Sequence, residues 1–336
     1  MPNFKFSVPY NNDFSMLEML AGDFGNGIGN NKIGELYLSG PQEIFGSGRI
    51  ITKKVNIADI VKVISFCHEN GIKANLLLNS SCEGTQWYQP GNVGMVLKLI
   101  RILHLENDLD AVTLANPLFI QKIKKEFPEI EINASVISRI DSVQMAIFFD
   151  KFGADVIIPD RDINRDLGLL KEVKEAVDCE LKLMVNEGCL FKCPYKIFHD
   201  NWISHASKEL INRNQDRLAQ PEIKNCSSIF KIDRSQLLKS SWIRPEDLVR
   251  YRGITSWFKI VGRDKPGGFI LKTAAAYLSE KSPKNLMEII NGSPPFFVDN
   301  ELLDKDNFFE RVTGCNKNCS KCHYCEEFAK KAVREL

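Results

Sequence analysis

Two groups of cysteines are the residues of this chain best suited to chemistry. In the first group, Cys189 and Cys193 are four positions apart, and Pro194 follows the second cysteine. A cysteine followed by proline occurs in segments that bind iron–sulfur clusters. Cys226 lies further along the same region. Free cysteines are often simply buried, but the Gly, Lys and Pro neighbours of this pair indicate a loop and favour a metal or cluster site.

The second group lies near the C-terminus and contains Cys315, Cys319, Cys322 and Cys325. Four thiolates at this density suit a four-iron cluster or a tetrahedral zinc ion, and spacing alone does not separate the two. We therefore expect two [4Fe–4S] clusters, one in each group, with zinc at the C-terminal group as the alternative. His323 lies inside the run and is interpreted as a bystander.

The first three C-terminal cysteines also match the C-x₃-C-x₂-C spacing of radical S-adenosylmethionine enzymes. In those enzymes the motif follows the first barrel strand, and its three cysteines leave one iron open for the cofactor. Here the motif follows the last predicted strand, and Cys325 is available as a fourth ligand. We do not favour the radical interpretation for that reason.

The bulk composition is that of a globular protein with a large core. The chain has 336 residues, of which 44% are hydrophobic and 26% charged, and a formal net charge of +1. This charge predicts no general attraction to nucleic acid or to anionic membranes, although a nucleic-acid substrate held by a local basic patch stays open. No signal peptide and no membrane span is expected, so a cytoplasmic location is predicted, where ten cysteines are not expected to form disulfides.

Short β-rich segments alternate with helical patterns along the chain, as in Ile57–Asn70, which Gly71 ends. Eight such strand–helix units predict a parallel (β/α)₈ barrel over residues 1–285, with a cysteine-bearing insertion after strand seven and a C-terminal cysteine-rich extension over residues 286–336. An open doubly wound sheet is the alternative, but no Gly-x-Gly-x-x-Gly turn follows the first strand. The predicted strands are Phe4–Val8, Glu35–Leu38, Lys73–Leu78, Ala111–Leu114, Glu131–Ser135, Asp155–Ile158, Glu180–Val185 and Trp257–Val261.

The active site of such a barrel lies at the C-terminal ends of its strands. Polar side chains at these ends form a rim of mixed charge that suits a small or medium-sized polar substrate. Asn and Ser at such positions often cap the next helix instead. The residues predicted to be catalytic are Asn116, Ser135, Arg161, Asn186 and Arg263, and further polar residues on the rim are Asn79, Arg139, Asp160, Asp162 and Glu187.

Three segments of the chain resemble the peptidase U32 family. Asn133–Ser135 and Val156–Asp162 are similar to that family's segments at strands five and six. Phe258–Arg263 is similar to its Lys-Ile-Glu-Gly-Arg motif, except that Val261 replaces the acidic residue. The C-terminal four-cysteine run is not a general feature of that family, so the resemblance indicates a subfamily with a distinct task.

The resemblance implies a chemistry and a set of ligands. The U32 family includes collagenase-like proteins and hydroxylation factors for RNA and ubiquinone, and members with an assigned chemistry tend to hold a [4Fe–4S] cluster on four cysteines. By resemblance, Cys189, Cys193 and Cys226 are three ligands, and Cys82 is the better choice for the fourth. The function implied is an oxygen-independent redox modification, of the hydroxylation type, of RNA, a quinone-like molecule or a peptide. Arg161 would help to bind an anionic group of that substrate.

Two other functions stay open. The family name suggests a peptidase, and His199 and His205 lie close enough to Cys193 in sequence for a Cys/His pair, although neither His-Glu-x-x-His nor Gly-x-Ser-x-Gly occurs. The chain could instead be a non-catalytic electron-transfer partner. Lysines of the C-terminal module would then dock an electron-donor protein, although such lysines often only solvate a helix. These lysines are Lys317, Lys321, Lys330 and Lys331.

Overall fold

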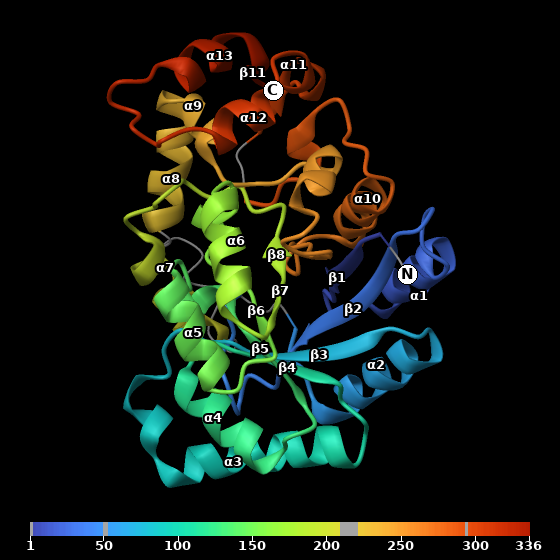
Figure 1. Cartoon of the computed structure of the whole chain (residues 1–336). Helices are drawn as coiled ribbons and strands as arrows, with labels where there is room; N and C mark the ends of the chain where they lie inside the picture. The colour runs from blue at the N-terminus through green and yellow to red at the C-terminus, as the bar shows by residue number, and fades with distance from the viewer. Residues whose placement is uncertain (1–2, 50–52, 209–220, 293–294) are drawn as a thin grey trace.

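Nine parallel strands form a nearly closed barrel, with helices between them (Figure 1). The computed structural model describes residues 3–49, 53–208, 221–292 and 295–336. Neighbouring strands pair in the order β7-β6-β5-β4-β3-β2-β1-β9-β8. The strands are β1 (Lys5–Pro9), β2 (Lys32–Ser39), β3 (Lys73–Leu78), β4 (Ala111–Leu114), β5 (Glu131–Ala134), β6 (Val156–Ile157), β7 (Glu180–Leu181), β8 (Leu183–Met184) and β9 (Trp257–Lys259).

The barrel is closed by a single stretch of chain that is interrupted at Lys182. β7 pairs with β6 on one side of the stretch, and β8 pairs with β9 on the other. The backbone N–H of Lys182 donates to Ile157 O at 2.9 Å, and that of Val185 donates to Lys259 O at 3.0 Å. The eight predicted strands are therefore confirmed, with the seventh divided into β7 and β8.

Helices follow the strands as the periodicity predicts. Several begin at a polar cap: the side chains of Asn56, Asn116, Ser142 and Asp166 each accept a backbone N–H of the first turn. Around the barrel lie α1 (Phe14–Phe24), α2 (Ile57–Glu69), α3 (Pro90–Ile100), α4 (Pro117–Glu126), α5 (Val143–Lys151), α6 (Leu167–Ala176) and α10 (Gly267–Leu278), and the insertion contributes α7 (Lys196–Lys208), α8 (Pro221–Ile232) and α9 (Ser235–Lys239). Short 3₁₀ turns cover Gly84–Tyr88, Val136–Ser138, Arg161–Ile163, Pro245–Tyr251 and Leu286–Glu288, and Arg101–Leu105 is a π-helical turn.

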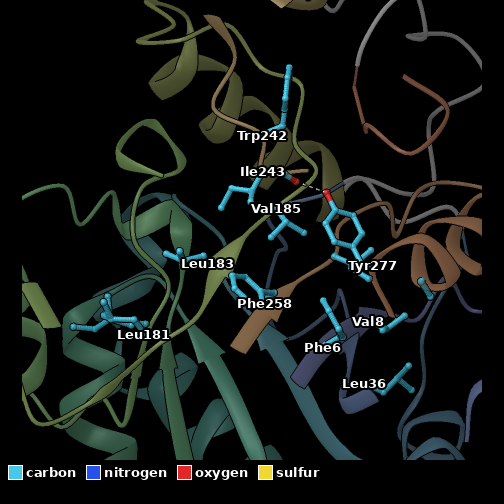
Figure 2. Packing of buried hydrophobic residues seen from close by; sticks show 14 of the residues in the cluster. Phe6, Val8, Leu36, Leu181, Leu183, Val185, Trp242, Ile243, Phe258 and Tyr277 are labelled. Carbon is cyan, nitrogen blue, oxygen red and sulfur yellow. Dashed lines mark hydrogen bonds between the residues drawn. The ribbon is translucent and has the colours of Figure 1, made fainter. Parts of the chain in front are cut away.

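Alternate residues of each strand point outward toward the helices, and these outward residues are apolar. Phe6 and Phe258 lie side by side under Tyr277 of α10 (Figure 2), with ring centroids 6.2 Å apart. The Tyr277 hydroxyl donates to Ile243 O at 2.7 Å, which satisfies its only polar atom. Each such aromatic ring contributes roughly 1.5–3 kcal/mol through burial. The hydrophobic core therefore lies between the barrel and its helices.

The inside of the barrel carries a buried polar layer. Lys182 Nζ donates to Glu35 Oε2 and to Asn133 Oδ1, each at 2.7 Å. The Ser7 hydroxyl donates to the same carboxylate, and Lys182 Nζ lies 3.7 Å from the centre of the Trp257 ring. A buried ion pair is stable only when its hydrogen bonds are satisfied, as they are here. This layer forms the floor beneath the barrel mouth.

The C-terminal extension packs on the insertion. It contains an antiparallel pair of strands, and its aromatic residues form a stack in which Phe308 lies 5.6 Å from Trp242 and 5.9 Å from Phe328. The last helix of the extension, α13 (Tyr324–Ala332), contacts α9 (Figure 1). No helix in the described ranges has the length and apolar composition needed to cross a bilayer. The elements of the extension are β10 (Phe296–Val298), α11 (Asn300–Lys305), α12 (Phe308–Thr313), α13 (Tyr324–Ala332) and β11 (Val333–Glu335).

Candidate functional site

A small cavity of about 80 Å³ opens at the C-terminal ends of the barrel strands. Its walls come from β2, β3, β8 and β9, from the loops that follow β2, β3, β5, β6, β8 and β9, and from α7. Six of the side chains that line this small cavity are charged, and this agrees with the predicted rim of mixed charge. The charged side chains that line it are Arg49, Arg161, Glu187, Asp200, Lys259 and Arg263.

One ion pair crosses the mouth. Arg49 Nη2 donates to Glu187 Oε2 at 2.6 Å. Burial alone would raise the pKa of Glu187, but Arg49 and Arg161 outweigh this effect and hold the pKa below its usual value. Glu187 is therefore a carboxylate that neutralises part of the positive charge of the cavity.

Two arginines present unused N–H groups to this cavity. Arg263 Nη2 donates to Ser47 Oγ at 2.7 Å, whereas its buried Nε and Nη1 have no hydrogen-bond partner among the described residues. The buried Nε of Arg161 also has none there. An unsatisfied buried donor costs about 1–3 kcal/mol, so an oxygen-bearing ligand would be bound favourably. Carboxylates and phosphates match the planar guanidinium group best.

The predicted barrel cysteines gather beside the same cavity. The thiol of Cys226 donates a hydrogen bond to Cys193, which lowers the pKa of Cys193 and raises that of Cys226. Cys189 lines the cavity, and its charge acts on Cys226. Burial raises the pKa of Cys189 to about 12, against the opposing effect of Arg161. Cys193 and Cys226 are thus in contact and Cys189 is within electrostatic range, but in the described ranges these three thiols are not arranged as a metal-binding group.

Buried ion pairs hold this part of the insertion against the barrel. Lys196, at the start of α7, donates to Asp160 Oδ1 at 2.9 Å and to Asp162 Oδ2 at 2.7 Å. Both carboxylates follow β6 and were predicted as rim residues. Because Cys193 lies three residues before Lys196, this cluster fixes the position of its loop.

Cys82 lies in the loop after β3, which contacts a later part of α7. The neighbouring Ser81 bonds to Asn201 Oδ1 at 2.8 Å and, through its backbone N–H, to Ser204 Oγ at 2.8 Å. Ser204 is eight residues after Lys196, which corresponds to about 12 Å along a helix. The segment that carries Cys82 therefore lies beside the middle of α7, and the role of Cys82 as fourth ligand stays a prediction.

The C-terminal cysteines occupy a loop and the start of α13. Cys315 and Cys319 both act on the pKa of Cys325, which burial raises to about 11. The backbone N–H of Lys317 donates to Cys315 Sγ at 3.3 Å. Across the described ranges, no three His, Cys, Asp or Glu side chains are arranged closely enough to hold a metal ion. The four thiols are thus neighbours in a short segment, in a geometry that is not a coordination sphere.

The other predicted catalytic residues differ in their surroundings. Ser135 lines the cavity, and its hydroxyl accepts from Asn79 Nδ2 at 3.2 Å. Asn116 caps α4 by accepting from Leu118 N at 2.9 Å. Asn186 bridges β8 to the end of β9, accepting from Val261 N at 2.7 Å and donating to Val261 O and Ile289 O at 3.0 Å. The observed contacts of both asparagines are structural.

Sequence reasoning missed four residues of the mouth that have polar or charged side chains. Tyr37 and Lys259 lie on the inner face of β2 and β9, and the alternation of side chains along these strands could have identified them. Arg49 and Asp200 come from irregular or inserted segments, and nothing in their spacing points to the mouth. Asp200 accepts from Arg139 Nη2 at 2.9 Å.

Comparison with known proteins agrees with this arrangement. The model of peptidase family U32 matches residues 28–193. A relative from Methanocaldococcus jannaschii, described as "Uncharacterized protease MJ1657", is 32% identical over 339 aligned positions, which cover 98% of this chain and 99% of the relative. A solved structure, "The Structure of the U32 Peptidase Mk0906", shares the fold with a TM-score of 0.55 at 19% identity, over 66% of this chain and 83% of that chain. The chain belongs to the peptidase U32 family.

Proposed function

We propose that this chain is an iron–sulfur enzyme that carries out an oxygen-independent redox modification, of the hydroxylation type, on RNA, a quinone-like molecule or a peptide. The observation that carries the proposal is the meeting of Cys189 with Arg161 and Arg263 at one barrel mouth. The arginines would bind an anionic group of the substrate. A separate electron-transfer protein would exchange electrons with the cluster, because a hydroxylation without O2 removes two electrons from the substrate.

The donor set suits a [4Fe–4S] cluster. Cys193 and Cys226 are within hydrogen-bond distance, and Cys189 is close enough to influence the pKa of Cys226. Thiolates are the ligands such clusters require. When bound, the cluster would supply electron transfer or Lewis acidity. Cys82 is the predicted fourth ligand, and the C-terminal cysteines would hold a second cluster or a zinc ion.

The chain's own residues have separate tasks in this proposal. Arg161 and Arg263 orient the substrate through its anionic group, and Glu187 keeps Arg49 engaged so that it does not compete for that group. Ser135, which also lines the cavity, would offer its hydroxyl to a polar atom of the substrate.

Metal analysis of anaerobically purified protein tests the proposal. Iron and acid-labile sulfide are measured in the wild-type protein and in Cys193→Ser and Cys226→Ser variants. We expect each variant to lose about four irons per chain. Cys67→Ser is the matched control, because Cys67 is buried on α2, away from the mouth. Iron-free protein after anaerobic reconstitution would refute the proposal.

A peptidase is the second candidate. The relative described as a protease favours it, as does the presence of both Cys189 and His199 in the lining of the mouth. Cleavage of a peptide library by metal-free protein, lost in Cys189→Ala, would support this candidate over the redox enzyme.

A further inference from the structure

Two lysines point into the barrel, and their surroundings differ. Lys182 has a carboxylate and an amide oxygen as hydrogen-bond acceptors. Lys259 lies nearer the mouth, at the end of β9, and is only 6% exposed. No acid lies within ion-pair distance of Lys259 in the described part of the chain, and no oxygen there accepts a hydrogen bond from its Nζ. Its ammonium instead lies 4.0 Å from the centre of the Tyr37 ring.

A lysine without an acceptor is expensive to keep charged inside a protein. The positive charges of Lys182 and Arg263 add to this cost, and the negative charge of Glu35 offsets part of it. Burial first, and Lys182 second, lower the pKa of Lys259 to about 7. At neutral pH a large fraction of this side chain is therefore a free amine, which is a nucleophile.

The amine faces a cavity that also holds anion-binding groups. Lys259 and Arg263 line the same cavity, and Arg263 has two N–H groups without acceptors among the described residues. A cavity of about 80 Å³ suits a ligand of only a few atoms. A small molecule with a carboxylate next to a carbonyl group would satisfy the guanidinium and bring its carbonyl carbon to the amine.

We propose that Lys259 is a catalytic nucleophile that forms an imine with a small anionic aldehyde bound through Arg263. The Lys259 Nζ forms a bond to the carbonyl carbon, the carbon–oxygen bond breaks, and the oxygen leaves as water with the two hydrogens of the amine. No electrons are exchanged, and no cofactor is needed. The inference goes beyond the redox proposal, because none of its residues is a predicted cluster ligand.

Reductive trapping with glyoxylate tests the inference. Anaerobically purified full-length protein is treated with glyoxylate and cyanoborohydride, and the labelled lysines are mapped and timed by mass spectrometry. We expect Lys259 to be labelled at least about tenfold faster than Lys98, which is exposed on α3, because an ordinary lysine is almost fully protonated at neutral pH. The Lys259→Met variant should lose the fast labelling and keep the slow labelling of exposed lysines. Lys98→Met is the matched control variant and should keep the fast labelling.

The role of Arg263 is tested by the charge of the aldehyde. Glycolaldehyde is a neutral aldehyde of similar size. Labelling of Lys259 should saturate with glyoxylate but not with glycolaldehyde, and Arg263→Gln should slow only the glyoxylate reaction. If Lys259 reacts no faster than Lys98 in the folded wild-type protein, the inference is overturned. Equal, non-saturating labelling by both aldehydes would likewise overturn it. Both results are independent of whether the protein contains iron.

Discussion

The protonation state of Lys259, at the mouth of the barrel, affects the stability of the folded protein. Its pKa in the folded protein is about 7, whereas an unfolded lysine titrates near pH 10.4. Between these values the unfolded chain binds more protons, so stability contributed by this group rises with pH. Below pH 7 Lys259 is protonated in the folded protein as well, so folding then carries the full cost of burying its charge.

The first prediction follows from this rise of stability with pH. Lys259→Met should remove a stability gain of a few kcal/mol that the wild-type protein acquires between about pH 7 and pH 10. Urea unfolding of both proteins at pH 7 and pH 9.5 measures it, with Lys182, Glu35 and Arg263 unchanged in both. A difference in unfolding free energy that is the same at the two pH values would contradict the lowered pKa.

The second prediction concerns Arg263 and its unused donors. Arg263→Gln should weaken the binding of inorganic phosphate about tenfold or more, since a hydrogen bond to a charged group contributes about 1.5–3 kcal/mol. Arg250→Gln is the control, because Arg250 is exposed and pairs with Glu310 instead. Calorimetric titration measures both affinities. Equal weakening in the two variants would show that only general charge is involved.

At the scale of elements, the barrel depends on the polar layer inside its strands. The third prediction is that Lys182→Met lowers the free energy of unfolding by about 3–5 kcal/mol, because Glu35 is left buried without its partner. The double variant Lys182→Met/Glu35→Leu should recover a large part of this loss. Chemical denaturation measures both. A double variant as unstable as the sum of its single variants would show that the two residues act independently.

The strands and helices were largely predictable from the sequence because local patterns dictate them. Apolar spacing and punctuating residues such as Gly71, which was expected to end the helix over Ile57–Asn70, gave their positions within a few residues. The division of the seventh strand was not predictable, since it depends on its first half pairing with β6 and its second half with β9, which lies far along the chain.

The site was predictable only in part. Arg161, Arg263, Ser135 and Cys189 line the cavity as residues at strand ends should. Asn116 was chosen by the same rule, yet its side chain caps a helix. A strand-end asparagine has the same sequence pattern in both situations, and only the packed structure distinguishes them.

At the scale of the whole molecule, the C-terminal extension and the barrel mouth are linked through the insertion. The Ser240 hydroxyl, just after α9, donates to Cys189 O at 2.6 Å, and α9 contacts both α8, which carries Cys226, and α13, which carries Cys325. One short helix therefore contacts elements of both cysteine groups.

The fourth prediction addresses the metal content of the extension. The variant Cys315→Ser/Cys319→Ser/Cys322→Ser/Cys325→Ser should contain about four irons per chain, against about eight in the wild-type protein. Anaerobic iron, sulfide and zinc analysis measures this. Loss of zinc alone would assign the segment to zinc, and unchanged iron and zinc would show that it holds no metal.

The closure of the barrel at β7, β8 and β9 also affects how the protein is made. On the ribosome, β1 through β8 emerge long before β9, which follows some 70 residues of insertion. During that interval β1 and β8 each have an unpaired edge, and exposed edges promote aggregation. Pairings between residues so distant in sequence also form slowly. A chain truncated before Trp257 should therefore collect as insoluble aggregates, and chaperones that bind nascent chains should raise the yield of the full-length protein.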